Sequence, residues 1–402
     1  MTLLSEIKIA AIKLNEDHCS KCLICYSVCP FEAISLDTET REVRIDIEKC
    51  QLCGICAGVC PSSAIELGYY DDRSLIDYVK GQMEALETKD LVVMCRGSSP
   101  PSCQILDVLK ERNVKVFIPL RVPCVGRMTA EFYLQALRIG ISKIIVVQCD
   151  PDFCRFKKGS AINLRKVLAL QVLLKQLGYG NDKLTIIKNP LKAVYETEKC
   201  VGCDKCEFVC PYDAIEVQPL ATPQINLEAC KGCGACALVC PHLAIQLKGF
   251  EYELSSQAIE GYKAKVDELR AKGISPLVLV FCCQWAEFSA LDHSTDSFVR
   301  ENAVIIEIPC FDGLDPVQVL EAFRSGFDGV LAVVCSEEDC KLREGRETAE
   351  RNVSALKQVL GKLNLAGRFE VYVASPRYLG TFDSMLESFT AKISSLPKMT
   401  TR

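Results

Sequence analysis

The chain reads Cys19-Ser-Lys-Cys-Leu-Ile-Cys-Tyr-Ser-Val-Cys-Pro30 near its start, and this spacing of four cysteines ahead of a proline decides the fold. Sixteen of the 26 cysteines fall into four copies of the spacing. The other three copies run over residues 50–61, 200–211 and 230–241. Three thiols on one tight loop suit three irons of a cubane, and the fourth thiol of such a run ligates a neighbouring cluster. The pattern therefore predicts [4Fe–4S] clusters.

The four runs form two close pairs, which is the arrangement of bacterial two-cluster ferredoxins. We therefore expect four [4Fe–4S] clusters, with the fourth cysteine of each run serving the other run's cluster. The expected ligand sets are Cys19, Cys22, Cys25 and Cys60; Cys29, Cys50, Cys53 and Cys56; Cys200, Cys203, Cys206 and Cys240; and Cys210, Cys230, Cys233 and Cys236. Zinc is the alternative, but zinc sites do not need crossed triplets that end in Cys-Pro.

The whole chain is a duplication, because further cysteines repeat along with the four runs. Cys124, Cys149 and Cys154 recur 186 positions later as Cys310, Cys335 and Cys340. The predicted fold is a multidomain α+β and α/β protein, in which two dicluster ferredoxin-like domains alternate with two small flavodoxin-like parallel-sheet modules. The expected domains are residues 1–72 and 191–254 for the ferredoxin-like units, and residues 73–190 and 255–402 for the modules.

The pattern of hydrophobic residues predicts the positions of the helices and strands. Inside the first ferredoxin pair, 34–36 and 43–45 read as a hairpin, and a helix follows at 74–86. Continuous Val/Ile/Leu runs that alternate with helices predict parallel sheets buried on both faces. The expected strands are 91–94, 115–118, 143–147 and 184–187, then 277–281, 304–308, 329–334 and 369–373. The expected helices are 102–111, 129–140 and 161–178, then 256–271, 316–326, 346–363 and 382–394.

A second kind of cysteine group follows the strands of each module. In open α/β sheets, ligands bind outside the carboxyl ends of the strands, so these thiols should converge. The first module offers Cys95, Cys124, Cys149 and Cys154, and the second offers Cys282 or Cys283 with Cys310, Cys335 and Cys340. Four thiolates suit a [2Fe–2S] cluster or a tetrahedral zinc, whereas single buried cysteines are simply small hydrophobes. We expect two [2Fe–2S] clusters, which leaves Cys103 and one of the two adjacent cysteines spare.

The cysteine-bearing segments of the second module resemble a known family. They are Phe281-Cys-Cys-Gln-Trp285, Pro309-Cys310 with a turn at Gly313, Ala322-Phe-Arg-Ser-Gly-Phe-Asp-Gly-Val330 and Cys335-Ser-Glu-Glu-Asp-Cys340. They look like the delta subunit of methyl-viologen-reducing hydrogenase, over roughly residues 276–395 and more weakly over 90–190. Family members often read Cys-Asn-Trp-Cys where this chain has Cys283-Gln-Trp-Ala286. That match favours Cys283 as the ligand, whereas counting from the preceding strand favours Cys282.

The resemblance implies a flavodoxin-like unit with a [2Fe–2S] cluster. It also implies an electron relay between a hydrogenase, formate dehydrogenase or other catalytic redox subunit and a flavoprotein of the heterodisulfide reductase A type. The expected function is therefore a non-catalytic electron-transfer subunit of an oxidoreductase complex. A component active in thiol or disulfide chemistry and a scaffold whose modules bind zinc remain alternatives. The first alternative is the chemistry of heterodisulfide reductases. Against it, the catalytic subunits of those enzymes resemble Cys-Cys-Gly repeats, and here Gln284 follows the cysteine pair.

The composition of the chain limits its expected partners and cellular compartment. The formal net charge is −5, and no stretch clusters lysine or arginine with aromatic residues, so nucleic acid is not an expected partner. Residues 1–16 lack the cleavage site of a signal peptide. No run of ~18 uninterrupted apolar residues would span a bilayer. So many thiols without a secretion signal indicate a reducing cytoplasm.

Basic residues follow the fourth cysteine of each module. They are Arg155, Lys157 and Lys158 in the first module, and Lys341, Arg343 and Arg346 in the second. Solvated helix starts are the default interpretation. Screening of an anionic cluster and docking of an acidic partner are the alternatives.

Overall fold

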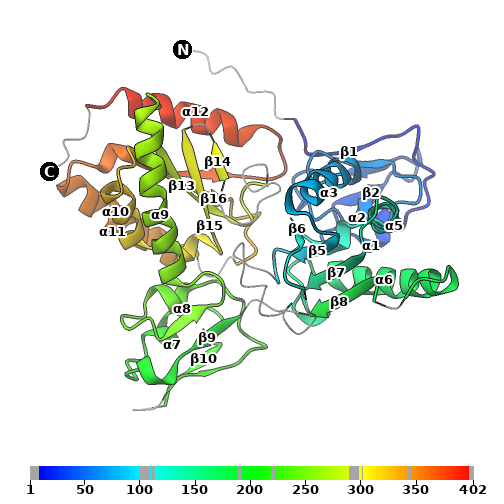
Figure 1. The fold of residues 1–402 in the computed structure, drawn as a ribbon, viewed down its shortest axis with the longest axis horizontal. Coiled ribbons are helices and arrows are strands. Elements are labelled where there is room, and N and C mark those ends of the chain that lie inside the picture. The colour runs from blue at the N-terminus through cyan, green and yellow to red at the C-terminus, as the bar shows by residue number, and fades with distance from the viewer. Residues whose placement is uncertain are drawn as a thin grey trace.

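The computed structural model describes residues 9–98, 109, 114–180, 182–188, 192–218, 222–288, 298–300, 302–342 and 346–397. Figure 1 shows the first cysteine-rich unit together with the first α/β module on one side, and the second module with its cysteine-rich unit below it on the other. Within these described residues, no helix is both long enough and apolar enough to cross a membrane.

The first cysteine-rich unit consists of two antiparallel ribbons and two very short helices. The ribbons pair β1 (Ile12–Leu14) with β4 (Ile65–Leu67), and β2 (Ile34–Leu36) with β3 (Val43–Ile45). The second ribbon confirms the predicted hairpin. The helices, α1 (Ile24–Val28) and α2 (Ile55–Gly58), each begin inside a cysteine run.

The second cysteine-rich unit repeats this plan. Its ribbons pair β9 (Ala193–Tyr195) with β12 (Ile245–Leu247), and β10 (Ile215–Glu216) with β11 (Gln224–Ile225). Its helices are η3 (Thr197–Lys199), α7 (Lys205–Val209) and α8 (Ala235–Leu238). In both units the first strand pairs with the last strand. This pairing brings the two cysteine runs of each unit side by side.

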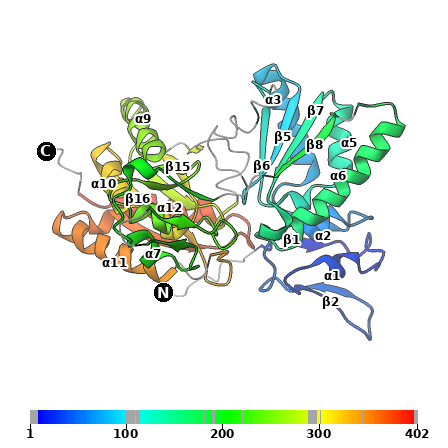
Figure 2. The same ribbon diagram turned by 90° about the horizontal axis from the view of Figure 1, so that it is seen from below.

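The first α/β module is a four-stranded parallel sheet of order β6-β5-β7-β8. Its strands are β5 (Asp90–Cys95), β6 (Ile118–Val122), β7 (Lys143–Gln148) and β8 (Leu184–Lys188). Its helices are α3 (Asp72–Leu86), η1 (Val125–Arg127), α5 (Ala130–Arg138), η2 (Pro151–Phe153) and α6 (Gly159–Gln176). Figure 2 shows the helices packed beside this sheet. The strands β5, β6 and β7 are almost wholly buried, as predicted for a parallel sheet, whereas only Leu184 is buried in the edge strand β8.

One strand of this sheet differs from the prediction. The sequence predicts it at 115–118, whereas β6 runs Ile118–Val122, and Val116 is half exposed. The difference arises at Pro119, which reads as the end of a strand because proline has no N–H to donate. β6 lies at the edge of its sheet, where a proline is tolerated. The predicted helix at 102–111 lies outside the described residues, apart from Leu109.

The second α/β module has a five-stranded sheet of order β14-β15-β13-β16-β17. Its strands are β13 (Val278–Cys283), β14 (Phe298–Arg300), β15 (Ala303–Ile308), β16 (Gly329–Cys335) and β17 (Phe369–Ala374). Its helices are α9 (Tyr252–Ala271), η4 (Phe311–Gly313), α10 (Pro316–Arg324), α11 (Arg346–Lys362), η6 (Ala366–Arg368) and α12 (Thr381–Ser394). The four predicted strands are confirmed. The sequence prediction missed β14, a three-residue strand antiparallel to β15.

Candidate iron–sulfur centres

One hollow of the first cysteine-rich unit is lined by Cys19, Cys22, Cys25 and Cys60. The loop that carries the first three winds back on itself at Lys21 and Leu23, which have φ angles of 55° and 61°. The fourth thiol comes from the other run, because the chain after it enters β4, and β4 pairs with β1 just ahead of the first cysteine. The N–H of Ala64 donates to the Cys60 sulfur at 3.3 Å.

The second expected set of this unit lies deeper in the molecule. Burial, together with the charges of Cys50 and Cys29, raises the pKa of Cys53 to about 12. Cys29 likewise raises the pKa of Cys50 and Cys56, although burial is the largest cause for both. Cys29 therefore sits beside the three thiols of the other run. Desolvated thiols ionise only with cations beside them, so this donor set fits bound iron.

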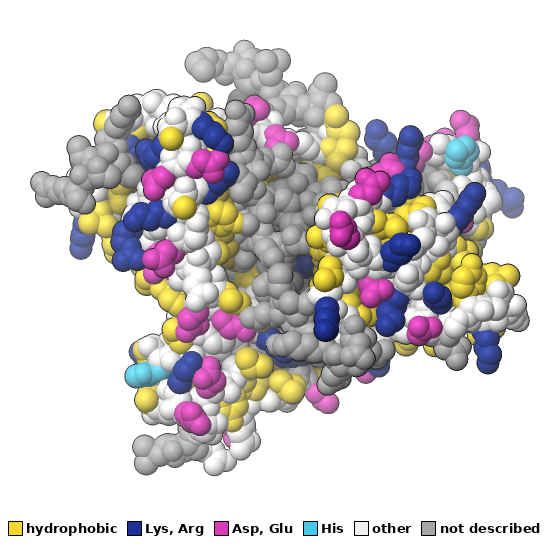
Figure 3. Space-filling view, in the orientation of Figure 1, with side chains coloured by type: hydrophobic (Ala, Val, Ile, Leu, Met, Phe, Trp, Pro, Cys, Tyr) yellow, Lys and Arg dark blue, Asp and Glu magenta, His cyan; other side chains and the backbone are white. Residues whose placement is uncertain are grey.

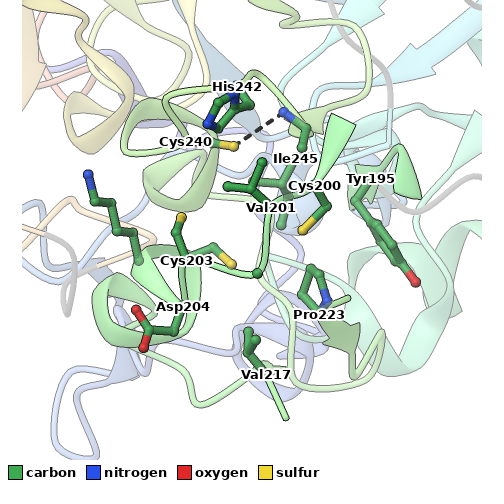
Figure 4. A pocket seen from close by; sticks show the side chains of 14 residues that line it. Tyr195, Cys200, Val201, Cys203, Asp204, Val217, Pro223, Cys240, His242 and Ile245 are labelled. Atoms are coloured by element: carbon green, nitrogen blue, oxygen red, sulfur yellow. Dashed lines mark hydrogen bonds between the residues drawn. The ribbon is translucent and has the colours of Figure 1, made fainter. Parts of the chain in front are cut away.

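The second cysteine-rich unit shows the same crossing. Cys200, Cys203, Cys206 and Cys240 line one hollow, and Cys210, Cys230, Cys233 and Cys236 line another. In Figure 4 the labelled cysteines of the first hollow surround a common space. The dashed line there is the N–H of Ala244 donating to the Cys240 sulfur at 3.2 Å. In both units, then, the fold gathers three thiols of one run with the last thiol of the other.

The first module gathers a quartet at the carboxyl edge of its sheet. Cys95 ends β5, Cys124 lies two residues after the end of β6, Cys149 directly follows β7, and Cys154 follows η2. The sulfurs of Cys95 and Cys149 are 3.7 Å apart. Hydrogen bonds from Cys124 and Cys149 lower the pKa of Cys95, and a hydrogen bond from Cys124 lowers that of Cys154. Four thiols thus form one connected group, buried except for the last.

Two glycines leave space for this quartet. A Cβ atom on Gly97 would lie 2.8 Å from the Cys149 sulfur, and one on Gly159 would overlap the Cys124 sulfur. Real Cβ atoms do not approach this closely, so any larger residue would displace a thiol. At Gly97 and Gly159 the backbone therefore lies close to the thiols on two sides of the quartet.

The second module gathers the equivalent quartet from Cys283, Cys310, Cys335 and Cys340. Hydrogen bonds from Cys310 and Cys335 lower the pKa of Cys340 to about 3. Cys335 is also in hydrogen-bond contact with Cys283, and this contact is the largest cause of its raised pKa. The N–H of Leu342 donates to the Cys340 sulfur at 3.4 Å.

The structure separates the two adjacent cysteines of β13. Successive side chains of a strand point to opposite faces, so only one of the two can face the quartet. Cys283 does so. Cys282 is fully buried on the other face, where burial raises its pKa and the nearby charges are those of Cys283, Glu287, Glu307 and Arg96. Cys103 lies outside the described residues.

Trp285 and Ala286 occupy the segment where the resemblance expects a further cysteine. Ala286 is fully buried, and the Trp285 ring packs edge-to-face on Phe156 with 5.6 Å between centroids. An aromatic contact therefore joins the two modules at this segment.

Lys341 departs from the default interpretation of the basic residues as solvated helix starts. Its ammonium donates to the side chain of Gln51 and to the carbonyl of Asp339, and it lies 5.2 Å from the centroid of the Phe156 ring. The charges of Cys335, Cys53 and Cys340 all act on it. The duplicated sequence singles out Lys341 as a basic residue after the fourth cysteine of its module. Only the fold shows that it lies between domains. Arg343 is outside the described residues, and the side chain of Arg346 is not described.

In the part of the chain that the structure describes, no three His, Cys, Asp or Glu side chains are close enough together to hold a single metal ion. A cluster spreads its thiolates over several irons and sulfides, so its ligands need not meet at one point.

Comparison with protein families finds two models, each matching twice. Residues 91–201 and 278–397 match the methyl-viologen-reducing hydrogenase delta subunit. Residues 18–64 and 199–244 match a 4Fe-4S dicluster domain, and these ranges enclose all sixteen cysteines of the four runs.

Curated relatives fall into two groups. Over 180 residues the chain is 36% identical to the A component of the ferredoxin/F(420)H(2)-dependent CoB-CoM heterodisulfide reductase of Methanosarcina acetivorans, which covers 44% of this chain and 22% of that protein. The corresponding A component of the ferredoxin:CoB-CoM heterodisulfide reductase of Methanosarcina mazei is 32% identical over 179 residues, again 44% of this chain and 22% of the relative. The chain thus spans only about a fifth of the length of these two relatives.

The other group consists of iron-sulfur D components of F420-non-reducing hydrogenases. The vhu iron-sulfur D component of the F420-non-reducing hydrogenase of Methanocaldococcus jannaschii is 29% identical over 126 residues, 31% of this chain and 94% of that protein. Because the delta-subunit model matches more than half of the 402 residues, in two separate copies, the chain belongs to the methyl-viologen-reducing hydrogenase delta-subunit family and carries two 4Fe-4S dicluster domains.

Proposed function

We propose that this chain is an electron-transfer subunit, not itself catalytic, that works inside a larger hydrogenase- or heterodisulfide-reductase-type complex. Iron–sulfur clusters supply one-electron transfer, and the six cysteine groups would hold them. The four ferredoxin sets are assigned to [4Fe–4S] clusters. The two module quartets, Cys95, Cys124, Cys149 and Cys154, and Cys283, Cys310, Cys335 and Cys340, are assigned to [2Fe–2S] clusters.

We assign both modules to the flavodoxin-like class. In each, the first strand lies between the second strand on one side and the third and fourth on the other, once the short β14 is set aside. The proposed domain limits are residues 1–72, 73–190, 191–254 and 255–402.

The observation that carries the proposal is that the cysteine groups adjoin one another through the interior. Cys53 and Cys124 belong to the same apolar cluster as the thiols of the second module's sheet. Cys233 packs in one cluster with Cys310 and Cys340. Each inner ferredoxin set therefore neighbours a module quartet, which suits electron movement inside the chain and needs no substrate pocket.

The two outer ferredoxin sets lie at the surface, and we assign them as entry points for electrons from the catalytic partner. Cys22 is exposed, and Tyr26 next to the same loop is 56% exposed. Beside the other outer set, Phe208 is 95% exposed and Val201 58%. Exposed apolar side chains around a redox site are typical of surfaces that dock a partner.

The proposed partners are a hydrogenase, formate dehydrogenase or other catalytic redox subunit, and a flavoprotein of the heterodisulfide reductase A type docked against the second module. The names of the curated relatives support this choice, since they are A components of heterodisulfide reductases and iron–sulfur components of hydrogenases. We place the complex in the cytoplasm, where reducing conditions keep thiols free to bind iron.

Metal analysis of anaerobically prepared protein tests the proposal. Four clusters of four irons and two of two should give about 20 iron atoms per chain, with an equal amount of acid-labile sulfide and no zinc. About 16 irons with two zinc atoms would instead support a scaffold. About 16 irons without zinc would mean empty modules.

A further inference from the structure

Helix α6 of the first module is apolar on both its inner and its outer face. The inner face packs Val167, Leu170 and Leu174 into the core of the module. Four exposed apolar residues on the outer face, which we call the α6 stripe, are Leu168, Ala169, Val172 and Leu173. A surface helix normally has polar residues on its outer face, and a helix that is apolar all round is normally buried. The composition of α6 is therefore that of a helix covered on both sides.

The α6 stripe is a continuous surface. Residues three and four apart on a helix are neighbours, and the leucine and valine side chains of the stripe are between 39% and 60% exposed. Figure 3 shows hydrophobic side chains gathered at the right edge of the molecule, where Figure 1 places α6. Figures 1 and 2 both show this helix extending away from the second module. Gly159, which adjoins the Cys124 sulfur, begins the helix, and the stripe starts about 13 Å further along the axis.

The duplication supplies an internal comparison, because α11 occupies the place of α6 in the second module, 186 positions later. The buried residues match one for one, with valine, leucine and leucine at 167, 170 and 174 and again at 353, 356 and 360. On the outer face, however, Leu168 and Val172 match Ser354 and Gln358, which are exposed polar residues. The fold of such a module therefore does not need an apolar outer face on this helix.

All charged residues of α6 are cations. The helix contains Arg165, Lys166 and Lys175 and no aspartate or glutamate, whereas α11 contains both signs. Lys166 turns inward, where its ammonium donates to the carbonyls of Gly58 and Met128. Arg165 and Lys175 are exposed near the two ends of the stripe. The apolar surface is thus flanked by positive charge.

We propose that the α6 stripe docks an amphipathic helix of a partner protein, with apolar side chains on its buried face and carboxylates beside them. Ridges of residues four apart pack into the grooves of a facing helix, so an apolar helix face suits a helical occupant. Carboxylates complement Arg165 and Lys175, whereas a second copy of α6 would bring cations against cations. Recognition of an anionic membrane takes clusters of about four to eight cations, more than α6 carries.

The inference rests on the proposed function in that the partner helix would belong to another subunit of the proposed complex. Fluorescence anisotropy with a labelled synthetic peptide and the full, cluster-loaded chain tests it under anaerobic conditions. The probe is an amphipathic helix of about 18 residues, or five turns, with leucine along one face and glutamate beside it. The expected result is saturable binding of one peptide per chain that weakens as salt is added. A peptide with lysine in place of glutamate should bind about tenfold more weakly or worse.

Variants taken from the duplicated helix localise the binding. Leu168→Ser combined with Val172→Gln installs the residues of α11 and should weaken binding of the glutamate peptide about tenfold or more, because apolar contact is lost. The iron content and the thermal unfolding midpoint should stay at their wild-type values, since α11 carries the same residues. Val317→Gln, on α10, removes an apolar side chain that is 51% exposed and should bind like the wild type. Lys175→Glu should weaken binding of the glutamate peptide and strengthen binding of the lysine peptide.

Four outcomes would overturn the proposal. They are no saturable binding of the glutamate peptide, wild-type affinity in the double variant, equal affinity for the two peptides, and a different occupant. A wild-type dimer in sedimentation that the double variant dissociates would assign the stripe to a second copy of the chain. Binding to phosphatidylserine vesicles that the double variant loses would assign it to a membrane. Peptide binding involves no electron transfer, so its failure leaves the proposed relay standing, and a failed relay would leave peptide binding intact.

Discussion

Arg121 and Glu307 form a buried ion pair across the two α/β modules, with 2.6 Å between Nη1 and Oε2 and only 3% of either side chain exposed. The two residues occupy the same position in the duplicated sequence, 186 residues apart, as Cys124 and Cys310 do. Arg96 and Gln284, which follow the equivalent Cys95 and Cys283, are also joined, by a 2.8 Å hydrogen bond to the Gln284 carbonyl. Equivalent surfaces of the two modules therefore face each other, as in a two-fold dimer.

Breaking this pair should destabilise the chain strongly. Glu307→Gln leaves the Arg121 guanidinium buried without its counter-charge, which typically costs about 3–5 kcal/mol. Thermal unfolding of the cluster-loaded protein should show a clearly lower midpoint. The double variant Arg121→Met, Glu307→Leu removes both charges and should regain most of the loss. A double variant as unstable as the single one would mean that the pair acts through shape and not through charge.

The crossed ligation predicts which cluster each substitution damages. Cys60→Ala should affect the set of Cys19, Cys22 and Cys25, so its electron paramagnetic spectrum should change as that of Cys22→Ala does. Cys53→Ala serves as the contrast, since it belongs to the neighbouring set. If the Cys60→Ala spectrum matched that of Cys53→Ala, each run would serve its own cluster and the crossing would be wrong.

The cysteine groups could be predicted because ligand spacing is local and because strand ends in a parallel sheet meet at one edge. The choice between Cys282 and Cys283 could not, since a shift of one residue along a strand turns the side chain to the other face. The prediction placed β6 too early because it ended the strand ahead of Pro119. The sequence does not say which strand lies at the edge of the sheet, where a proline is tolerated. The contacts of Lys341 and Glu307 depend on how the domains pack, and no spacing along the chain encodes that.

Substitution of the two adjacent cysteines should separate their roles. Cys283→Ala should remove the second module's cluster and lower the iron content from about 20 to about 18 per chain. Cys282→Ala should keep all of the iron and cost on the order of 1 kcal/mol of stability, as a small deletion in a core. Iron analysis beside thermal unfolding makes the comparison. Iron loss in the Cys282 variant alone would reverse the assignment.

Gly159 should be sensitive to a single added methyl group. Gly159→Ala places a Cβ against the Cys124 sulfur, so the first module's quartet should lose its geometry and its two irons. Gly81, inside α3, has nothing within 4 Å of an added Cβ. Gly81→Ala should therefore keep its iron and gain up to about 1 kcal/mol, as alanine does over glycine in a helix. Full iron content in Gly159→Ala would show that the quartet does not need this space.

The proposed role predicts where electron transfer stops. Cys335→Ala removes a thiol in contact with both Cys283 and Cys340, so the second module should no longer pass electrons to the flavoprotein. The four ferredoxin clusters should remain reducible by a low-potential donor, because none of their expected ligands is touched. Rapid-mixing spectroscopy of the assembled complex measures both the reduction of the ferredoxin clusters and the transfer of electrons to the flavoprotein. Cys282→Ala is the matched buried-cysteine control.

Two outcomes would contradict that role. Transfer at the wild-type rate in Cys335→Ala would take the second module off the electron path, and the search for the exit would then move to the exposed surface around Phe208. Turnover of disulfide substrates by the isolated chain would replace the relay with an enzyme. A relay needs adjoining redox sites and docking surfaces but no substrate pocket, so the isolated wild-type chain should accept electrons and reduce no disulfide.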